Sequence, residues 1–280
     1  QENLGAVYGR IVSPSKIEIT NNTVNDVTME EKTVYHVNNI NDLQAAVNNG
    51  GYVVLLNDLE LSNQSLLINN ELVLDLNGYT LSFINDNGIV VENNSKLTVI
   101  GKGTVKSDSL VNDLFKVNSG VLVLENNDYQ MNSQATTYLV SCYNNSLAEL
   151  KDGKYYGSTI TPLFNPDNIT NIKIYGGKYQ TTNPAYGKNN DHSYDDKQNM
   201  LANGYYSYSL GDLLNDGNKW YEVRETLEEG KVSINGEVFN TINEAVENGL
   251  LFKVNKEAVI EISGLVYLNN NNDKSLKGLD

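Results

Sequence analysis

A short apolar pattern that recurs at a nearly constant interval constrains the fold of this 280-residue chain more than any other feature. Each occurrence is a stretch of alternating apolar residues followed by a turn-forming residue. The turn-forming residues are spaced by 21, 23, 25, 26 and 24 positions, and they are Asn57, Gly78, Gly101, Asn126, Asp152 and Gly176. The positions two and four residues earlier are all apolar: Val53, Leu55, Leu74, Leu76, Leu97, Val99, Leu122, Leu124, Ala148, Leu150, Ile172 and Ile174. Such self-similarity indicates a repeat architecture.

Alternating apolar residues that end at glycine, asparagine or aspartate are typical of a β-strand followed by a tight turn. A unit of about 24 residues is too short for a propeller blade, and these units lack the leucine-rich consensus of horseshoe repeats. The length suits one coil of a parallel β-helix, in which each coil buries its inward side chains against the coils above and below. The pattern therefore predicts an all-β, single-stranded parallel β-helix with a columnar core.

Tyrosines recur three residues after the turn position in the later coils. Thr104, Tyr129, Tyr155 and Tyr179 occupy this place, and equivalent positions of neighbouring coils stack on one another. One interpretation is a structural ladder of stacked rings. The other is an aromatic strip that binds sugars, which requires the column to face solvent. Together with the neighbouring Tyr175, the three tyrosines form the candidate ligand-binding set.

Two adjacent glycines, Gly176 and Gly177, follow the sixth apolar pair and could be either a backbone cradle for an anion or a place where the chain turns. Asn57, Asn126 and Asp152 hold the place of Gly176 in other coils. Asparagine and aspartate tolerate left-handed backbone but do not replace a phosphate-cradling glycine. We therefore interpret the glycine pair as part of the scaffold, at a turn with left-handed φ. The 44 asparagines of the chain likewise predict many tight turns.

Both ends of the repeat carry segments that could cover an open solenoid. Residues 39–50 space Ile40, Leu43, Ala46 and Val47 helically before Gly50, which predicts a short capping helix over 40–49. A similar pattern returns at 237–249, and tyrosine-rich runs around 215–218 predict a hairpin. The expected organisation is a leader, linker or edge strand over 1–34, a β-helix over 35–200, a closing β-hairpin over 201–226, and the start of a second similar unit or a C-terminal cap over 227–280.

Composition narrows the possible partners. The formal net charge of −15 and the pI near 4.5 argue against nucleic acid and anionic membranes, because phosphate contacts need clustered lysine and arginine. No apolar run approaches the roughly 18 residues of a membrane helix, so membrane insertion is not expected. The single Cys142 excludes an intrachain disulfide and makes a cysteine-based zinc site implausible. Scarce cysteine also fits an exported bacterial protein, whose export signal would have been removed or left out before Gln1.

Three segments together carry a resemblance. The capping-helix pattern with its following apolar strand, the coil IYGGKYQ and the hairpin GYYSYS…NDGNKWYEV resemble right-handed parallel β-helix units of bacterial surface proteins, which belong to the broad pectate-lyase-like superfamily. The resemblance covers roughly residues 35–250 and implies a right-handed coil and an extracellular or cell-surface location. This superfamily includes lyases, hydrolases, adhesins and phage fibres, so the fold alone does not imply an activity.

The catalytic motifs of that superfamily are not matched. Its pectate lyases use an aspartate-bound Ca²⁺ and a cationic base, usually arginine, on the outer face of the coils. The only arginines here are Arg10 and Arg224, outside the predicted coils, although Lys102, Lys154 or Lys178 could substitute. Its polygalacturonases carry Asn-Thr-Asp, an Asp-Asp pair, His-Gly and Arg-x-Lys, and of these Asn-Thr-Asp, His-Gly and Arg-x-Lys do not occur in the coil region. Catalytic residues are therefore not assigned.

The densest ionisable cluster holds Asp191, His192, Asp195 and Asp196. A solvated loop is the usual explanation of such a polar stretch. The alternative is a cation site in which Asp191, Asp195 and Asp196 hold Ca²⁺, because carboxylates are the ligands that this ion prefers. No other cofactor is expected.

The leading functional hypothesis is a non-enzymatic, extracellular β-helix module of a bacterial surface protein, used for adhesion or contact with a glycan or a host-cell surface protein. A second hypothesis is a polysaccharide lyase or glycoside hydrolase that works in a groove along the coils. A third is a phage fibre or tailspike module, which shares the fold.

Overall fold

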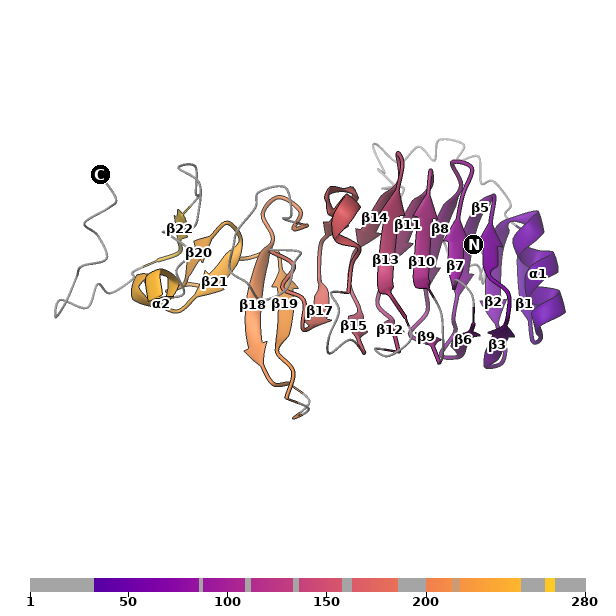
Figure 1. Ribbon diagram of the computed structural model, residues 1–280, viewed down its shortest axis with the longest axis horizontal. Coiled ribbons are helices and arrows are strands. Elements are labelled where there is room, and N and C mark those ends of the chain that lie inside the picture. The colour runs from indigo at the N-terminus through magenta and orange to yellow at the C-terminus, as the bar shows by residue number, and fades with distance from the viewer. Residues whose placement is uncertain are drawn as a thin grey trace, which may run out of the picture. The chain divides into compact units, whose positions relative to one another are not determined.

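The repeat folds into a parallel β-solenoid of about five turns (Figure 1). The computed structural model describes residues 33–85, 88–108, 112–132, 136–157, 163–185, 200–213, 215, 217–247 and 260–264. Residues 1–32 of the expected leader, linker or edge strand lie outside the described residues. From residue 33 on, the chain forms one unit.

Strands of neighbouring coils pair in parallel and form three sheets among the described residues. The first sheet contains β1 (Val34–Val37), β2 (Gly51–Leu55), β5 (Glu71–Asp75), β8 (Lys96–Ile100), β11 (Val121–Leu124), β14 (Leu147–Leu150) and β16 (Ile172–Ile174). The second contains β4 (Leu66–Ile68), β7 (Ile89–Val91), β10 (Asp113–Asn118) and β13 (Tyr138–Tyr143). The third begins with β3 (Leu59–Ser62), β6 (Thr80–Ile84), β9 (Thr104–Ser107), β12 (Asp128–Gln130), β15 (Lys154–Tyr156) and β17 (Gly177–Gln180).

The predicted apolar column is the core. All twelve residues of the apolar pairs are fully buried, and they form one cluster with inward residues of the other two sheets. The predicted alignment of the second coil with the third is wrong, because the ladder pairs Leu74 with Val99 rather than with Leu97. The turn-forming glycines of these two coils, Gly78 and Gly101, occupy different places in their turns. Gly101 directly follows the last paired residue of its strand, whereas Gly78 comes later in a longer turn.

Asparagine supplies most of the left-handed turn positions that are not glycine in the described chain. Of eleven non-glycine residues with positive φ, eight are asparagine. Some of these asparagines also bond to an asparagine of the previous coil, as Asn85 Nδ2 does to Asn63 Oδ1 (3.1 Å) and Asn93 Nδ2 to Asn69 Oδ1 (2.9 Å). These exposed bonds link consecutive coils at the corners of the solenoid.

The glycine pair needs a correction. Left-handed φ occurs at Gly177 (101°), whereas Gly176 is not among the residues with positive φ. Gly176 is constrained instead by close approach, because a Cβ there would lie 2.5 Å from the Lys151 carbonyl oxygen of the previous coil. Both glycines are scaffold residues, as expected, but for two different reasons.

A helix covers the first coil. Helix α1 (Ile40–Asn49) buries Leu43, Ala46 and Val47 and packs against β1 to β4. The side chain of Asn39 accepts a hydrogen bond from the Asp42 N–H (3.0 Å), so it satisfies one of the free donors at the start of the helix. The predicted capping helix is confirmed within these bounds.

Replacing Asn39 with alanine is expected to lower the free energy of unfolding by about 1 kcal/mol, because the first-turn N–H then has no side-chain acceptor. Urea unfolding measures this loss. Asn39→Ser, which keeps a capping acceptor without placing a second carboxylate beside Asp42, should retain most of the wild-type stability, and an equal loss in both variants would contradict the capping role.

The other end of the solenoid is closed by antiparallel strands. The hairpin of β18 (Tyr206–Gly211) and β19 (Trp220–Arg224) continues the third sheet, and β19 pairs with β17. A second hairpin of β20 (Val232–Ile234) and β21 (Glu237–Phe239) precedes helix α2 (Ile242–Glu247), and β22 (Ile260–Ile262) pairs with β20. A 3₁₀ helix, η1 (Pro166–Asn171), packs against β13. That 227–280 begins a second unit stays a prediction.

Candidate functional site

The tyrosine ladder lies inside the solenoid. The rings of Tyr129, Tyr155 and Tyr179 are fully buried and stack with centroid distances of 4.9 and 4.7 Å. Their hydroxyls donate to the carbonyls of Glu125, Asp152 and Gly176 at 2.8, 2.9 and 2.6 Å. Burial raises the pKa of all three phenols above the ordinary value, because the charged form would lose its hydration.

The buried position of these three tyrosines shows that their interpretation as a sugar-binding aromatic strip is wrong, because that interpretation requires the column to face solvent. Side chains alternate between the two faces of a strand, and the ladder positions fall on the inward face. The register also removes Thr104 from the column, because Tyr129 pairs with Val105. Tyr129, Tyr155 and Tyr179 are therefore unavailable to a ligand.

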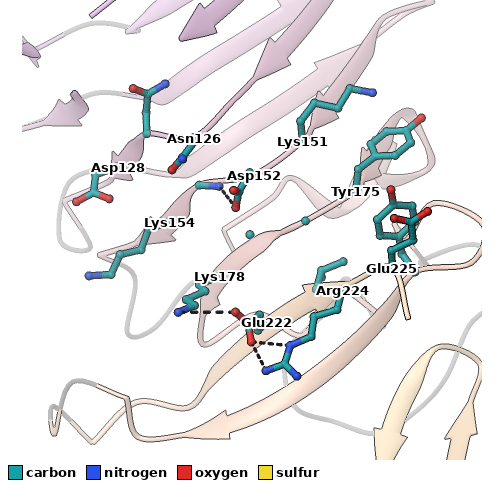
Figure 2. Close-up of a pocket in the computed structure, with 16 residues that line it drawn as sticks. Asn126, Asp128, Lys151, Asp152, Lys154, Tyr175, Lys178, Glu222, Arg224 and Glu225 are labelled. Carbon is teal, nitrogen blue, oxygen red and sulfur yellow. Dashed lines mark hydrogen bonds and ion pairs between the residues drawn. The ribbon is translucent and has the colours of Figure 1, made fainter. Parts of the chain in front are cut away.

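The fourth candidate, Tyr175, lines a surface hollow of about 550 Å³ near the C-terminal end of the solenoid (Figure 2). The hollow lies where the chain passes from the first sheet to the third in the last coils, and β19 forms its opposite wall. Its lining consists of Asn126, Asn127, Asp128, Lys151, Asp152, Gly153, Lys154, Tyr175, Gly176, Gly177, Lys178, Tyr205, Glu222, Val223, Arg224 and Glu225.

Tyr175 is held in place by its neighbours. Its ring meets that of Tyr205 edge to face at 5.6 Å, and Lys151 Nζ lies 3.6 Å from its centroid. Its hydroxyl lies 3.2 Å from Glu149 Oε1, and Glu149 also pairs with Lys151 at 3.1 Å. Partial burial, followed by the charge of Glu149, raises the pKa of Tyr175, so the phenol stays neutral. The ring is thus a fixed, half-buried surface.

Stacked strands bring opposite charges together along the hollow. Asp128, Lys154 and Lys178 occupy paired positions on β12, β15 and β17, and Glu222 of β19 pairs with Lys178. Lys178 Nζ and Glu222 Oε1 are 3.7 Å apart. Lys154 lies over the rings of Tyr156 and Trp220 at 4.9 and 5.4 Å.

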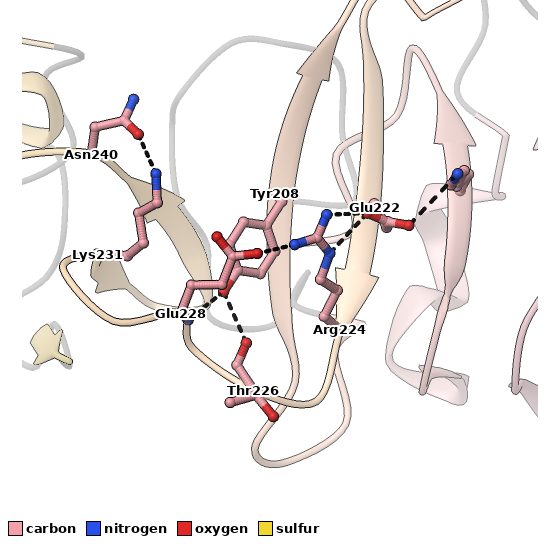
Figure 3. Close-up of polar contacts among 8 residues, drawn as sticks. Tyr208, Glu222, Arg224, Thr226, Glu228, Lys231 and Asn240 are labelled. Atoms are coloured by element: carbon pink, nitrogen blue, oxygen red, sulfur yellow. Dashed lines mark hydrogen bonds and ion pairs between the residues drawn. The ribbon is translucent and has the colours of Figure 1, made fainter. Parts of the chain in front are cut away.

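Arg224 is the centre of a second set of contacts (Figure 3). Its guanidinium bonds to Glu222 and to Glu228, and it lies 4.7 Å from the centroid of Tyr208. The Tyr208 hydroxyl in turn donates to the Thr226 carbonyl at 2.9 Å. The hydrogen bond to Glu222 is the main cause of a raised pKa at Arg224. A guanidinium held in this way stays protonated and is a poor proton acceptor.

The hollow can therefore bind a polar ligand through hydrogen bonds, which its cationic side chains donate and its anionic side chains accept. It combines four cationic side chains, Lys151, Lys154, Lys178 and Arg224, with four anionic ones, Asp128, Asp152, Glu222 and Glu225. Asp152 additionally accepts from the Gly153 N–H at 2.7 Å. Such a mixed lining beside an aromatic ring suits a ligand that is rich in hydroxyl groups, which both donate and accept.

Among the described residues, the carboxyl groups of Asp113 and Glu237 have raised pKa values, and neither lines this hollow. Burial raises the pKa of Asp113 on β10 and raises that of Glu237 on β21 to about 8. The candidate cation ligands Asp191, Asp195 and Asp196 lie outside the described residues, together with His192. Among the residues that the structure does describe, no group of three or more histidine, cysteine, aspartate or glutamate side chains could hold a metal ion.

Sequence reasoning identified one side of the hollow and missed the other. The repeat points to Tyr175, whereas the segment 201–226, which holds Glu222 and Arg224, is expected to form a hairpin outside the coils. The antiparallel pairing of β17 with β19 brings them beside Lys178. The signal that could have found them is the alternation in WYEVR, which puts Glu222 on the opposite face from Tyr221 and Val223.

Searches for related proteins identified no matching family model, curated protein or solved structure. Within the described part of the chain, no helix is long and apolar enough to span a membrane.

Proposed function

We propose that this chain is an exported, non-enzymatic β-solenoid module of a bacterial surface protein, of the pectate-lyase-like kind, that adheres to a glycan through the hollow beside Tyr175. The observation that carries the proposal is the lining of this hollow. A ring fixed on three sides stands next to equal numbers of acidic and basic side chains on a rigid scaffold. Saccharides present apolar C–H faces to such a ring and hydroxyls to such charges.

The chemistry of the hollow favours binding over bond cleavage. Its arginine is held between two glutamates, which favours the charged form and disfavours proton abstraction. The carboxyl groups whose pKa is raised, as a general acid requires, lie elsewhere. These two observations support adhesion as the primary role.

Replacing Tyr175 with alanine is expected to weaken glycan binding by about 2 kcal/mol, roughly thirtyfold in Kd, because an aromatic anchor in a binding site carries much of the energy. A glycan array on the wild-type chain identifies the ligand, and calorimetry measures the variant. Tyr143→Ala is the matched control, because Tyr143 is a half-buried tyrosine that also lies beside a lysine, Lys116, but on the second sheet.

The proposal fails if the wild-type chain binds no glycan on the array or on cells and instead degrades a polyuronide. It also fails if Tyr143→Ala weakens glycan binding as much as Tyr175→Ala does.

A polysaccharide lyase is the second candidate, and one observation favours it. Three lysines, Lys151, Lys154 and Lys178, meet in the hollow, where their charges could hold an anionic uronate polymer. The appearance of unsaturated products from a uronate polymer, lost in Lys154→Ala, would support this activity. Lys154 is the test position because its contacts are with rings.

A further inference from the structure

A buried polar cluster joins three segments at the C-terminal end of the solenoid. Asn183 follows β17, Ser207 lies on β18 and Glu237 lies on β21. Asn183 Nδ2 donates to Glu237 Oε1 at 3.1 Å, and Asn183 Oδ1 accepts from Ser207 Oγ at 2.7 Å and from the Ala185 N–H at 3.1 Å. All three side chains are buried. The cluster therefore connects the last coil, the closing hairpin and the strands that follow.

Among the described residues, the backbone pairing of β21 with β18 is short. The two strands pair at a single position, Ser207 with Glu237, and the Ser207 N–H donates to the Gly236 carbonyl at 2.7 Å. The same residues that make this backbone contact thus also form the side-chain cluster. A change at Glu237 acts directly on the junction.

The Glu237 carboxyl group is suited to the protonated state. It is only 9 % exposed, and its Oε2 atom has no hydrogen-bond partner among the described residues. A carboxylate in this place would bury a negative charge with one oxygen unsolvated, which is far more costly than burying a neutral acid.

No described cation offsets that charge. Ser207 on β18 and Ile234 on β20 are uncharged, and so is Asn183 in the loop after β17. The charged group that faces Glu237 is Glu244 in the first turn of α2, whose negative charge opposes ionisation. In agreement with this geometry, burial is the main cause that raises the pKa of Glu237 from 4.5 to about 8.

We propose that Glu237 is a proton-dependent latch, which holds β20, β21 and α2 against the closing hairpin while its carboxyl group is protonated and weakens that contact when it ionises. The folded form keeps the proton at a pH where the unfolded form has lost it. The stabilisation is complete below pH 4.5, decreases as pH rises, and is lost above about pH 8. The latch does not depend on what the hollow binds.

Hydrogen exchange of the Ser207 amide tests the latch in the full-length chain, because this N–H makes the junction bond. After correction for the intrinsic exchange rate, the equilibrium constant for opening at the Ser207 amide should rise about tenfold per pH unit between roughly pH 5 and 8. In Glu237→Gln, a neutral side chain of the same shape, it should not change with pH. The Lys178 amide, which bonds to Gly153 within the solenoid, should show no such dependence in either protein.

Glu229→Gln is the matched control, because Glu229 is an exposed carboxyl in the turn before β20 and should leave the pH dependence of wild type intact. If Glu237→Gln does not fold, carboxyl ¹³C shifts of the wild-type chain decide. A midpoint for Glu237 near 8 supports the latch, and a midpoint near 4.5 overturns it. A pH dependence retained in folded Glu237→Gln overturns it as well.

Discussion

Replacing Tyr155 with alanine is expected to lower the free energy of unfolding by about 4 kcal/mol. Its ring is fully buried and stacked between those of Tyr129 and Tyr179, so its removal leaves a cavity in the middle of the ladder. Neighbouring coils cannot close this cavity, because their backbones are fixed by the hydrogen bonds of three sheets. Urea unfolding followed by far-UV circular dichroism measures the loss.

Two further substitutions separate the contribution of the buried Tyr155 ring to stability from that of its hydroxyl and from that of a tyrosine ring at the surface. Tyr155→Phe keeps the stack and removes the hydroxyl that donates to the Asp152 carbonyl, so a loss of about 1 kcal/mol is expected. Tyr175→Ala removes a half-buried ring from the surface and should cost clearly less than Tyr155→Ala. If the two alanine variants were equally stable, the ladder would not be a core element.

Replacing Gly101 with alanine is expected to cost about 3 kcal/mol, from strained backbone and a steric clash together. Its φ is 100°, and a Cβ would lie 1.8 Å from Asp75 Oδ1 and 2.8 Å from the Asn77 nitrogen. Asp75 cannot move away freely, because its carboxylate accepts from the Tyr52 hydroxyl (2.7 Å) and from the Asn77 N–H (2.9 Å). Urea unfolding again provides the measurement.

A glycine in the corresponding turn of the previous coil is the control. Gly78 also has left-handed φ (86°), but a Cβ there would meet nothing within 4 Å. Gly78→Ala should therefore cost only about 1 kcal/mol, the penalty for placing a side chain in left-handed backbone. Equal losses in the two variants would mean that φ alone, rather than the close approach of the coils, sets the requirement for glycine at Gly101.

The core of the solenoid could be predicted because its signal is local. A strand buries every second side chain, so a period of two that recurs at coil length marks the inward positions directly. Pairs such as Leu97 and Val99 are fully buried as predicted. The register of one coil on the next was harder to predict from this local pattern. The turn between Asp75 and Thr80 is longer than its counterpart in the next coil, and this difference leaves the alternation undisturbed.

The candidate site was predictable only in part. Tyr175 could be singled out, because it follows the apolar pair of its coil. The sequence does not decide whether the tyrosine ladder faces the core or the solvent. Alternation shows which residues share a face of the strand, but not whether an aromatic column lies inside. The pairing of Glu222 with Lys178 joins two strands that are far apart in the sequence, and a repeat of single-coil length carries no information about it.

The parallel coils, their inward residues and the helix over the first coil can be read from the amino-acid sequence, because short-range periodicity and capping are properties of consecutive residues. The burial of the tyrosine column, the return of β19 onto β17, and the meeting of Asn183, Ser207 and Glu237 are visible only in the folded chain. These features depend on contacts between segments far apart in the chain. Their free energy comes from burial and pairing across coils, which no local pattern records.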